Sequence, residues 1–594
     1  MQRPSHLQGS NRTERSIEDA HGPLGVATSR VLDRVASSLG LLQEAAPEFV
    51  PANNVCNAGV LFLVPALLAQ GLLKASSILS PLRKGYYGLM SILLVLAFMF
   101  LSRIKCPEQL KMCKVGELGK SIGLDRVPEV RCLREKIAQI VNQEKTEELS
   151  QGLLHEWMNQ EADGTFFYID GHVRVYHGSL ANLPKRFVSR EKLCLSGTTE
   201  FWVNNELGMP YMVVTGELND KLKDIILNEV VPALLRETAG RVSQKQLDED
   251  QDRARFVIVF DREAYDLGFF KQLWDSHRIA VLTYRKSVKD LWPSSEFSQV
   301  HTTVIGKSVV MDLCEKAWEH EKCSMREIRK ISENGHQTSI ISTMRQATSA
   351  FLAGKMFSRW SQENFFRYLV QDYDLDRMVQ YGVEEVNPQA EVVNPSYRNL
   401  ASRIKKKREK LARVKAKLFA KIEDNLVADI DSIKYELEQQ SKLQDTIAEH
   451  ERDIKQLCTE LEQTPRRVKV KDMPPDCRYN KLKSESKLFM NALRMIAYRS
   501  ECAVANALVP YYSRSEEEIR MLVKEIIRSD ADLIPDFCDK TLTVRLHSLS
   551  TPRANNAAHE LCNILNETET IFPGTDLRMV YETVQFHSTG NQEF

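Results

Sequence analysis

Three acidic residues stand where a folded chain could use their charge. Asp170 follows the apolar run "FFYI", Asp261 follows "FVIVF", and Glu363 lies in "RWSQENFFRY", a stretch with helical spacing. A carboxylate placed against a buried strand is costly unless a partner uses its charge. If the two apolar runs are neighbouring strands, the aspartates lie side by side, and a helix packed on that sheet can add Glu363.

Clustered carboxylates raise one another's pKa unless a cation neutralises them. Oxygen ligands favour Mg²⁺ or Mn²⁺, and a pair of such ions promotes in-line displacement at a phosphodiester. We therefore expect Asp170, Asp261 and Glu363 to be the catalytic residues and the ligands of two Mg²⁺ or Mn²⁺ ions. Taken singly, Asp261 is more often a turn cap and Glu363 a solvated helix residue, so only their joint placement favours a site.

The elements around these acids predict a mixed sheet. The pattern after residue 160 is three strands, helix, strand, helix, strand, with a tight break expected at Asp170-Gly171. Several strand-like runs follow between 300 and 343, and one helix is expected over about 345–370. Strands that alternate with helices indicate an α/β fold whose sheet carries helices on its faces.

This order of elements resembles the RNase H-like fold, and the acids resemble the catalytic triad of DDE transposases from bacterial insertion sequences. Around their third acid those enzymes show Y-x-x-R-x-x-x-E-x-x-x-x-x-x-K. Arg359 and Glu363 match this signature, whereas Met356 and Val370 stand at its tyrosine and lysine positions. The resemblance implies a catalytic domain over 156–385 with a β-rich insertion at about 287–343.

The resemblance also implies a function. Such an enzyme cleaves transposon ends and joins them to target DNA by direct transesterification, so its partners would be double-stranded DNA at both sites. Pairing of two ends implies a homodimer on DNA, and Arg359 would contact that DNA. A cytoplasmic, nucleoid-associated protein of a bacterium is expected.

The flanking segments predict four further parts. Residues 1–50 are expected to be a disordered tail, 51–155 a helical DNA-binding domain, and 470–594 a small α/β unit. Residues 396–463 lack glycine and proline, and apolar residues seven positions apart predict a coiled-coil hairpin. Ten lysines or arginines against one acid over 403–421 predict phosphate contacts. The DNA-binding residues expected there are Lys405, Lys406, Lys407, Arg408 and Lys410.

Other classes find little support in the sequence. Eighty basic residues balance eighty acidic ones, so net charge indicates no partner. The twelve cysteines form no C-x-x-C pair, which argues against structural zinc and for a reducing compartment. "GELGKS" has Lys114 where a phosphate-binding loop needs glycine. The apolar segments 60–73 and 86–105 are short or interrupted, so buried core helices are expected rather than a membrane span.

Three alternatives stay open at this stage. One is a catalytically inactive DNA-binding relative of a transposase, which the missing tyrosine and lysine favour. Another is a simple RNase H-like nuclease, and the third is a membrane-associated protein built on residues 55–105.

Overall fold

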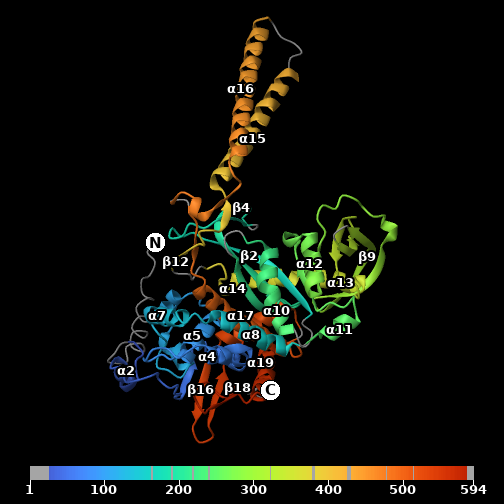
Figure 1. Ribbon diagram of the computed structural model, residues 1–594. Helices are drawn as coiled ribbons and strands as arrows, with labels where there is room; N and C mark the ends of the chain where they lie inside the picture. The colour runs from blue at the N-terminus through green and yellow to red at the C-terminus, as the bar shows by residue number, and fades with distance from the viewer. Residues whose placement is uncertain are drawn as a thin grey trace, which may run out of the picture.

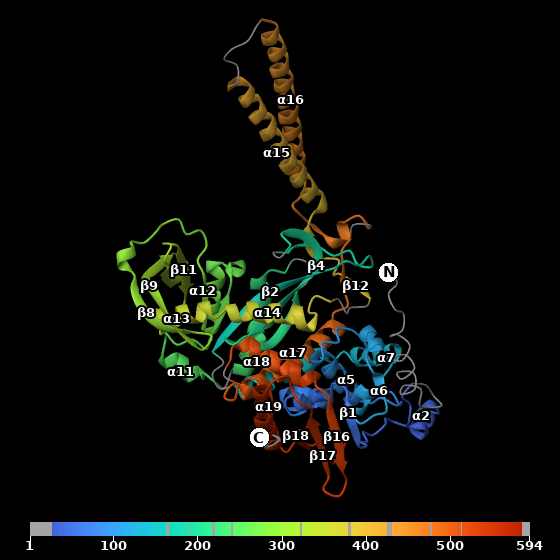
Figure 2. The same cartoon turned by 180° about the vertical axis from the view of Figure 1, so that it is seen from behind.

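The computed structural model describes most of the chain and divides it into three parts (Figures 1 and 2). The described residues are 26–161, 165–188, 191–216, 220–238, 241–320, 323–377, 382–423, 430–475, 478–512 and 514–584. A long mixed sheet occupies the middle, a base built from both ends of the chain packs below it, and two long helices project from the opposite side.

The main sheet follows the order β3-β4-β2-β6-β7-β11-β10-β9-β8, with β5 paired to β4 and β3 (Lys185–Val188) at one edge. Its central strands are β2 (Phe166–Val175), β4 (Leu193–Asn204), β5 (Pro210–Gly216), β6 (Phe256–Phe260) and β7 (Ile279–Tyr284). β2, β4 and β5 are antiparallel neighbours, whereas β6 and β7 run parallel to β2. The expected order of strands and helices is confirmed, and this strand order is the RNase H-like arrangement.

The β-rich insertion is continuous with the main sheet. It contains β8 (Ser298–Val304), β9 (Lys307–His320), β10 (Cys323–Ile331) and β11 (Gln337–Ser342). β11 pairs antiparallel with β7, so the insertion extends the sheet at that edge. The first insertion strand begins at Ser298, later than the boundary of 287 expected from the sequence.

The base is formed jointly by the two ends of the chain. Strand β1 (Ala52–Val55) pairs with β16 (Ala531–Asp536) in a sheet of order β1-β16-β17-β18. The remaining strands are β17 (Thr541–Leu546) and β18 (Arg578–Thr583). The expectation of a separate unit over 470–594 is therefore wrong, because its sheet includes a strand from residues 52–55 and its side chains share one hydrophobic core with the N-terminal helices.

Helix α17 (Glu485–Leu508) is the centre of the base. It packs against α3 (Val64–Leu67), α5 (Leu89–Leu101) and α8 (Thr146–Gln160) from the N-terminal part, and against α18 (Glu516–Arg528) and α19 (Pro552–Asn566) from the C-terminal part. Almost every residue of α5 is buried as well. Helices that are apolar on all sides need this complete enclosure.

The expected tail does not extend to residue 50. Residues 1–25 lie outside the described part, but Val31–Ser38 form helix α2 and the side chains of Ala45 and Phe49 are buried. Arg34 in α2 forms an ion pair with Asp125 at 2.5 Å. A polar segment is thus held to the base by charge rather than by an apolar pattern.

The most membrane-like segment lies inside the protein. Among the described residues, Ala58–Ile78 is the one helical run long and apolar enough to cross a membrane, and 72% of its most apolar window is buried in the molecule. The run is also broken at Gly71, whose φ of 120° is not helical.

Two long helices, α15 (Pro395–Glu423) and α16 (Ile430–Gln463), form the helix hairpin (residues 395–463). They pack side by side, and Ile404 and Leu457 are buried between them. At 1.5 Å per residue the 29 residues of α15 extend about 44 Å from the sheet. Figure 1 shows the hairpin standing clear of the rest of the molecule.

Candidate active site

Asp170 and Asp261 occupy neighbouring positions on two parallel strands. Ile169 pairs with Phe260 in the register of β2 and β6, so the aspartates are the next residues on each strand. Adjacent strands lie about 4.8 Å apart. The predicted neighbourhood of the two aspartates is therefore present at the centre of the main sheet.

The chain does not break at Asp170-Gly171 as the sequence suggested. β2 continues to Val175, and its pairing with β4 runs without interruption from Tyr168 to Val175. Gly171 gives close packing there, because a Cβ atom would lie 3.2 Å from the ring of Phe201, which would have to shift slightly. Asp170 thus lies within a strand, at the point where the shorter β6 stops.

Asp261 is both a site residue and a cap. Its Oδ1 accepts a hydrogen bond of 2.6 Å from the backbone N–H of Arg262 and starts the short 3-10 helix Arg262–Ala264. The cap fixes the backbone where β6 ends, and Asp261 still lines the cavity shared with Asp170. The interpretation of Asp261 as a turn cap and its interpretation as a site residue are therefore compatible.

Glu363 comes from helix α14 (Trp360–Tyr373). The single helix expected over 345–370 is in fact two, since α13 (Ser349–Phe357) ends before Ser358 and Arg359. This interruption lets α14 begin next to the middle of β2, at the level where β6 ends.

Gln362 anchors α14 to the sheet and has no signal in the sequence pattern. Its fully buried amide nitrogen lies 3.1 Å from the carbonyl oxygens of Tyr168 and Trp202 and 3.0 Å from Oδ1 of Asn204. These contacts join the helix to β2 and β4 one residue before Glu363. A buried amide that bonds to two strands fixes both the height and the rotation of the helix.

Arg359 lies among the acids instead of at an open DNA-facing surface. Its Nη1 donates to Oδ2 of Asp170 at 3.1 Å and its Nη2 donates to Oε1 of Glu363 at 2.8 Å. The side chain is only 11% exposed. The guanidinium is engaged by two carboxylates, so the expected contact of Arg359 with DNA would require it to leave them.

The electrostatics of the cluster show an excess of negative charge. Burial raises the pKa of Asp170, Arg359 opposes that rise, and Asp261 and Glu363 add to it. Burial raises the pKa of Glu263, and repulsion from Asp170 and Asp261 raises it further. Arg186 opposes this rise. Burial alone would lower the pKa of Arg359, but Asp170, Asp261 and Glu363 raise it above its ordinary value. The guanidinium of Arg359 thus faces three carboxyl groups, and Arg186 acts on the fourth, Glu263.

These side chains line one open cavity of about 980 Å³, here called the acid cavity. Its acidic lining residues are Asp170, Asp220, Asp261, Glu263 and Glu363, and its arginines are Arg186, Arg359 and Arg367. His172 lies within β2, stacks on Phe366 at 5.3 Å and pairs with Asp376 at 2.7 Å. The cavity is large enough for a phosphodiester segment and offers both acids and guanidinium donors.

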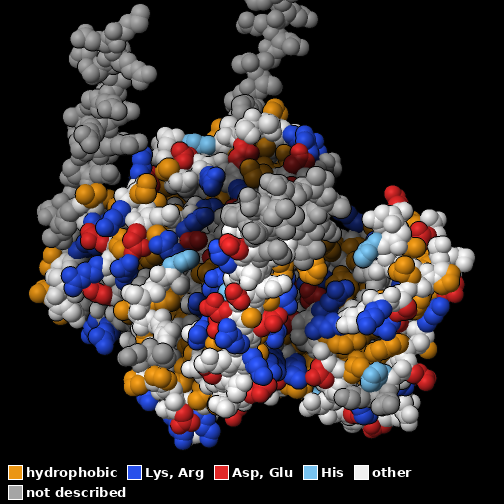
Figure 3. All heavy atoms as spheres, turned by 90° about the horizontal axis from the view of Figure 1, so that it is seen from above, with side chains coloured by type: hydrophobic (Ala, Val, Ile, Leu, Met, Phe, Trp, Pro, Cys, Tyr) orange, Lys and Arg blue, Asp and Glu red, His pale blue; other side chains and the backbone are white. Residues whose placement is uncertain are grey.

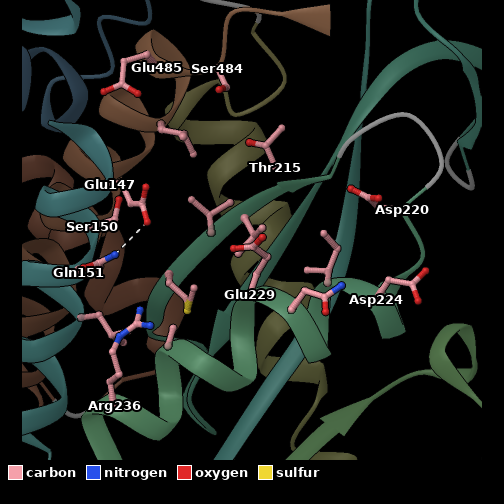
Figure 4. A pocket seen from close by; sticks show the side chains of 18 residues that line it. Glu147, Ser150, Gln151, Thr215, Asp220, Asp224, Glu229, Arg236, Ser484 and Glu485 are labelled. Atoms are coloured by element: carbon pink, nitrogen blue, oxygen red, sulfur yellow. Dashed lines mark hydrogen bonds between the residues drawn. The ribbon is translucent and has the colours of Figure 1, made fainter. Parts of the chain in front are cut away.

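A second cavity, of about 640 Å³, lies beside the first and has a different character. Figure 4 shows Glu147, Asp224, Glu229 and Glu485 around it, with Arg236 at one end. None of the three predicted acids lines it. Its lining has five carboxylates and one arginine, so it offers fewer phosphate-binding donors than the acid cavity with its three arginines.

The predicted basic residues of the helix hairpin are mostly available. Lys405, Lys406, Arg408 and Lys410 are exposed on α15, whereas Lys407 forms an ion pair with Asp453 of α16. On the face seen from the hairpin side, lysine and arginine side chains are interspersed with acids (Figure 3). Positive charge is therefore concentrated on one helix rather than spread over that face.

The donor set of the acid cavity suits a hard divalent cation, because carboxylate oxygens are the ligands that Mg²⁺ and Mn²⁺ prefer. The arrangement, however, has Arg359 as its counter-cation. Within the described ranges, no three His, Cys, Asp or Glu side chains are grouped so that they could hold a metal ion. Metal binding would thus require Arg359 to move.

The sheet order and the acids at its centre define an RNase H-like α/β protein with a carboxylate site at the junction of two parallel strands. A family model described as "Transposase protein" matches residues 25–585. The chain therefore belongs to this transposase family.

Two further comparisons add little. No curated protein matches the chain. One solved structure, a piggyBac transposase synaptic complex with hairpin DNA, is similar at 10% identity over 53% of this chain and 68% of that chain, with a TM-score of 0.28. So low a score adds nothing to the strand order as support for the fold.

Proposed function

We propose that the protein is a DDE transposase that cleaves DNA at transposon ends and joins those ends to target DNA. One observation carries the proposal: the parallel register of β2 and β6 places Asp170 beside Asp261, and Arg359 links Asp170 to Glu363. Membership of a transposase family supports the reaction class. DNA is the partner that the basic hairpin and the arginines of the acid cavity fit.

Asp170, Asp261 and Glu363 would hold Mg²⁺ or Mn²⁺, which when bound lowers the pKa of an attacking water and stabilises the leaving oxygen. The arginine and lysine side chains of the protein would bind the DNA phosphates. Arg186 and Arg367 line the acid cavity and would orient a phosphate there. The exposed residues of α15 would neutralise phosphates outside the cavity. Since two ends must be paired, we propose a homodimer assembled on DNA.

The test uses duplex DNA that carries the sequences flanking the protein's own gene, with Mg²⁺ present. Wild type should nick the terminal repeats and transfer the new 3′-ends to a target plasmid. Asp261→Asn should lose at least about 100-fold in cleavage, as expected when a group essential to the chemistry is removed, while its DNA affinity stays within about twofold. Equal cutting by both proteins would reject the assignment.

One observation favours a second candidate, a catalytically inactive DNA-binding relative. Arg359 pairs with two of the three acids, which is an arrangement that an inactive protein could keep permanently. Binding of the terminal repeats without nicking, in wild type as in Asp261→Asn, would support that candidate. Nicking without joined products would instead indicate a simple nuclease.

A further inference from the structure

Arg359 is placed to be a permanent neighbour of the acids. It is the residue immediately before α14, four positions ahead of Glu363, so the start of one helix carries both groups. Its guanidinium uses one nitrogen for Asp170 and another for Glu363, which come from different elements. The two hydrogen bonds of Arg359 therefore connect β2 to α14 and also neutralise the two carboxylates.

The bridge uses the oxygens that a metal would need. Oδ2 of Asp170 accepts from Nη1, and Oε1 of Glu363 accepts from Nη2. The other oxygen of Asp170, Oδ1, accepts the backbone N–H of Gly171 at 2.8 Å. Each oxygen of Asp170 thus accepts one hydrogen bond, and the guanidinium on Oδ2 would compete with a divalent ion for that carboxylate by charge repulsion and by position.

A guanidinium of Arg359 displaced from the two carboxylates could bind a phosphate in the acid cavity. The acid cavity contains Arg359 in its lining and opens to solvent beside Arg186 and Arg367. A guanidinium binds phosphate with the same two-pronged geometry that it uses for carboxylates. A DNA phosphate in the cavity is thus the natural replacement for the two carboxylates.

We propose that Arg359 is an exchange residue: it is the counter-cation of the acids in the free protein, and it transfers to a DNA phosphate when a divalent ion takes its place. This inference rests on the proposed function. It predicts that metal and DNA each favour binding of the other, because a phosphate that holds Arg359 frees the carboxylate oxygens. Arg359 thus competes with the ion for the carboxylates in the free protein and is a phosphate ligand in the complex.

The first test measures Mn²⁺ affinity of the full chain without DNA, by the loss of the electron paramagnetic resonance signal of free Mn²⁺. Arg359→Ala should bind Mn²⁺ about tenfold more tightly than wild type, because it removes a competing ion pair. Arg359→Lys keeps the charge but cannot bridge both acids, so its affinity should lie between the two. The control is Arg345→Ala, which removes an ion-paired arginine outside the acid cavity (Arg345 pairs with Asp252 at 2.8 Å), and it should match wild type.

The second test adds a short duplex of random sequence. DNA should tighten Mn²⁺ binding to wild type and to Arg345→Ala by severalfold, and it should leave Mn²⁺ binding to Arg359→Ala unchanged. Thermal unfolding without metal establishes that each variant is folded, and Arg359→Lys supplies the comparison if Arg359→Ala is not.

The possible outcomes distinguish failure of the Arg359 exchange from failure of the proposed transposase function. If wild type binds Mn²⁺ and Arg359→Ala binds it equally or more weakly, the exchange is refuted while the metal site stands. If DNA tightens Mn²⁺ binding equally in both, the transfer to phosphate is refuted. If neither wild type nor Arg359→Ala binds Mn²⁺, the metal-dependent function itself fails along with the inference.

Discussion

At the scale of single residues, buried carboxylates of the protein are neutralised by direct hydrogen bonds from arginine side chains. Arg359 provides them in the acid cavity. In the base, the fully buried carboxylate of Asp125 accepts hydrogen bonds from Nε of Arg34 at 3.0 Å and from the hydroxyl of Tyr86 at 2.8 Å. Burial alone would raise the pKa of Asp125, but the hydrogen bonds from Arg34 and Tyr86 lower it below its ordinary value.

This cluster gives a pH-dependent prediction for Asp125→Asn. A carboxyl whose pKa is lowered by folding stabilises the protein above its unfolded pKa of about 3.9, and that stabilisation is lost as the pH falls through the folded value. At pH 7 the variant should therefore lose roughly 3 kcal/mol of unfolding free energy. The difference from wild type should shrink as the pH falls below about 4.

Urea unfolding between pH 7 and pH 3.5 measures this difference. Asp33→Asn is the control, since Asp33 pairs with Arg30 at a partly exposed position and its loss should cost less than about 1 kcal/mol. A difference for Asp125→Asn that stayed constant across the whole range would contradict the assignment.

At the scale of elements, the helix hairpin can be separated from the rest of the fold. The backbone N–H of Asn394 donates to the carbonyl of Arg466 at 3.0 Å, so the two ends of the hairpin meet at its root. The strands Glu391–Val393 and Arg467–Lys469 pair directly below it. A short glycine-containing turn could therefore replace residues 395–465 without disturbing the sheet.

We expect this excision to leave the melting temperature of the remaining protein within about 3 °C of wild type, since little of its core is removed. DNA affinity should fall, and the slope of its logarithm against the logarithm of salt concentration should flatten by about 3 to 4 because four phosphate contacts are lost. Glutamine at positions 405, 406, 408 and 410 in an intact hairpin should flatten the slope equally. An unchanged slope in both proteins would show that the hairpin does not contact DNA.

Elements are also the scale at which the sequence predicts best. The order of the central strands and the long helices follow from local apolar patterns, and the structure agrees with them. The placement of Asp170 beside Asp261 needed the further condition that their strands are neighbours, which the structure meets. The break at Gly171 was wrong because strand pairing with β4 outweighs a local turn signal. The roles of Arg359 and Gln362 were out of reach, since they depend on which helix face meets two strands more than 150 residues away in the chain.

At the scale of the whole molecule, the two chain ends interlock. The N–H of Asn57 donates to Asp530 at 3.1 Å, and the rings of Phe62 and Tyr581 meet at 5.0 Å. A Cβ atom on Gly59 would lie 1.9 Å from the carbonyl oxygen of Ile526, so the backbones touch there. No local pattern links β1 to β16, which explains why the sequence suggested two independent parts.

We predict that neither half of the base folds alone. A fragment of residues 478–584 should show no cooperative thermal transition by circular dichroism, because β16 loses β1 and α17 loses its apolar partners. Co-expression with residues 26–475 should yield a soluble complex. Cooperative folding of the fragment by itself as a monomer would contradict the interlocked base.

The pairing of β1 with β16 also bears on how the protein is made. The backbone N–H of Asn54 donates to the carboxylate of Asp532, which lies 478 positions later in the chain. At the usual synthesis rate of 5–20 residues per second, Asp532 is made roughly 25 to 95 s after Asn54. During that time the apolar segment from Ala58 to Leu101 is on the ribosome without its C-terminal partners. Nascent chains of this protein should therefore depend on chaperones until the last strand emerges.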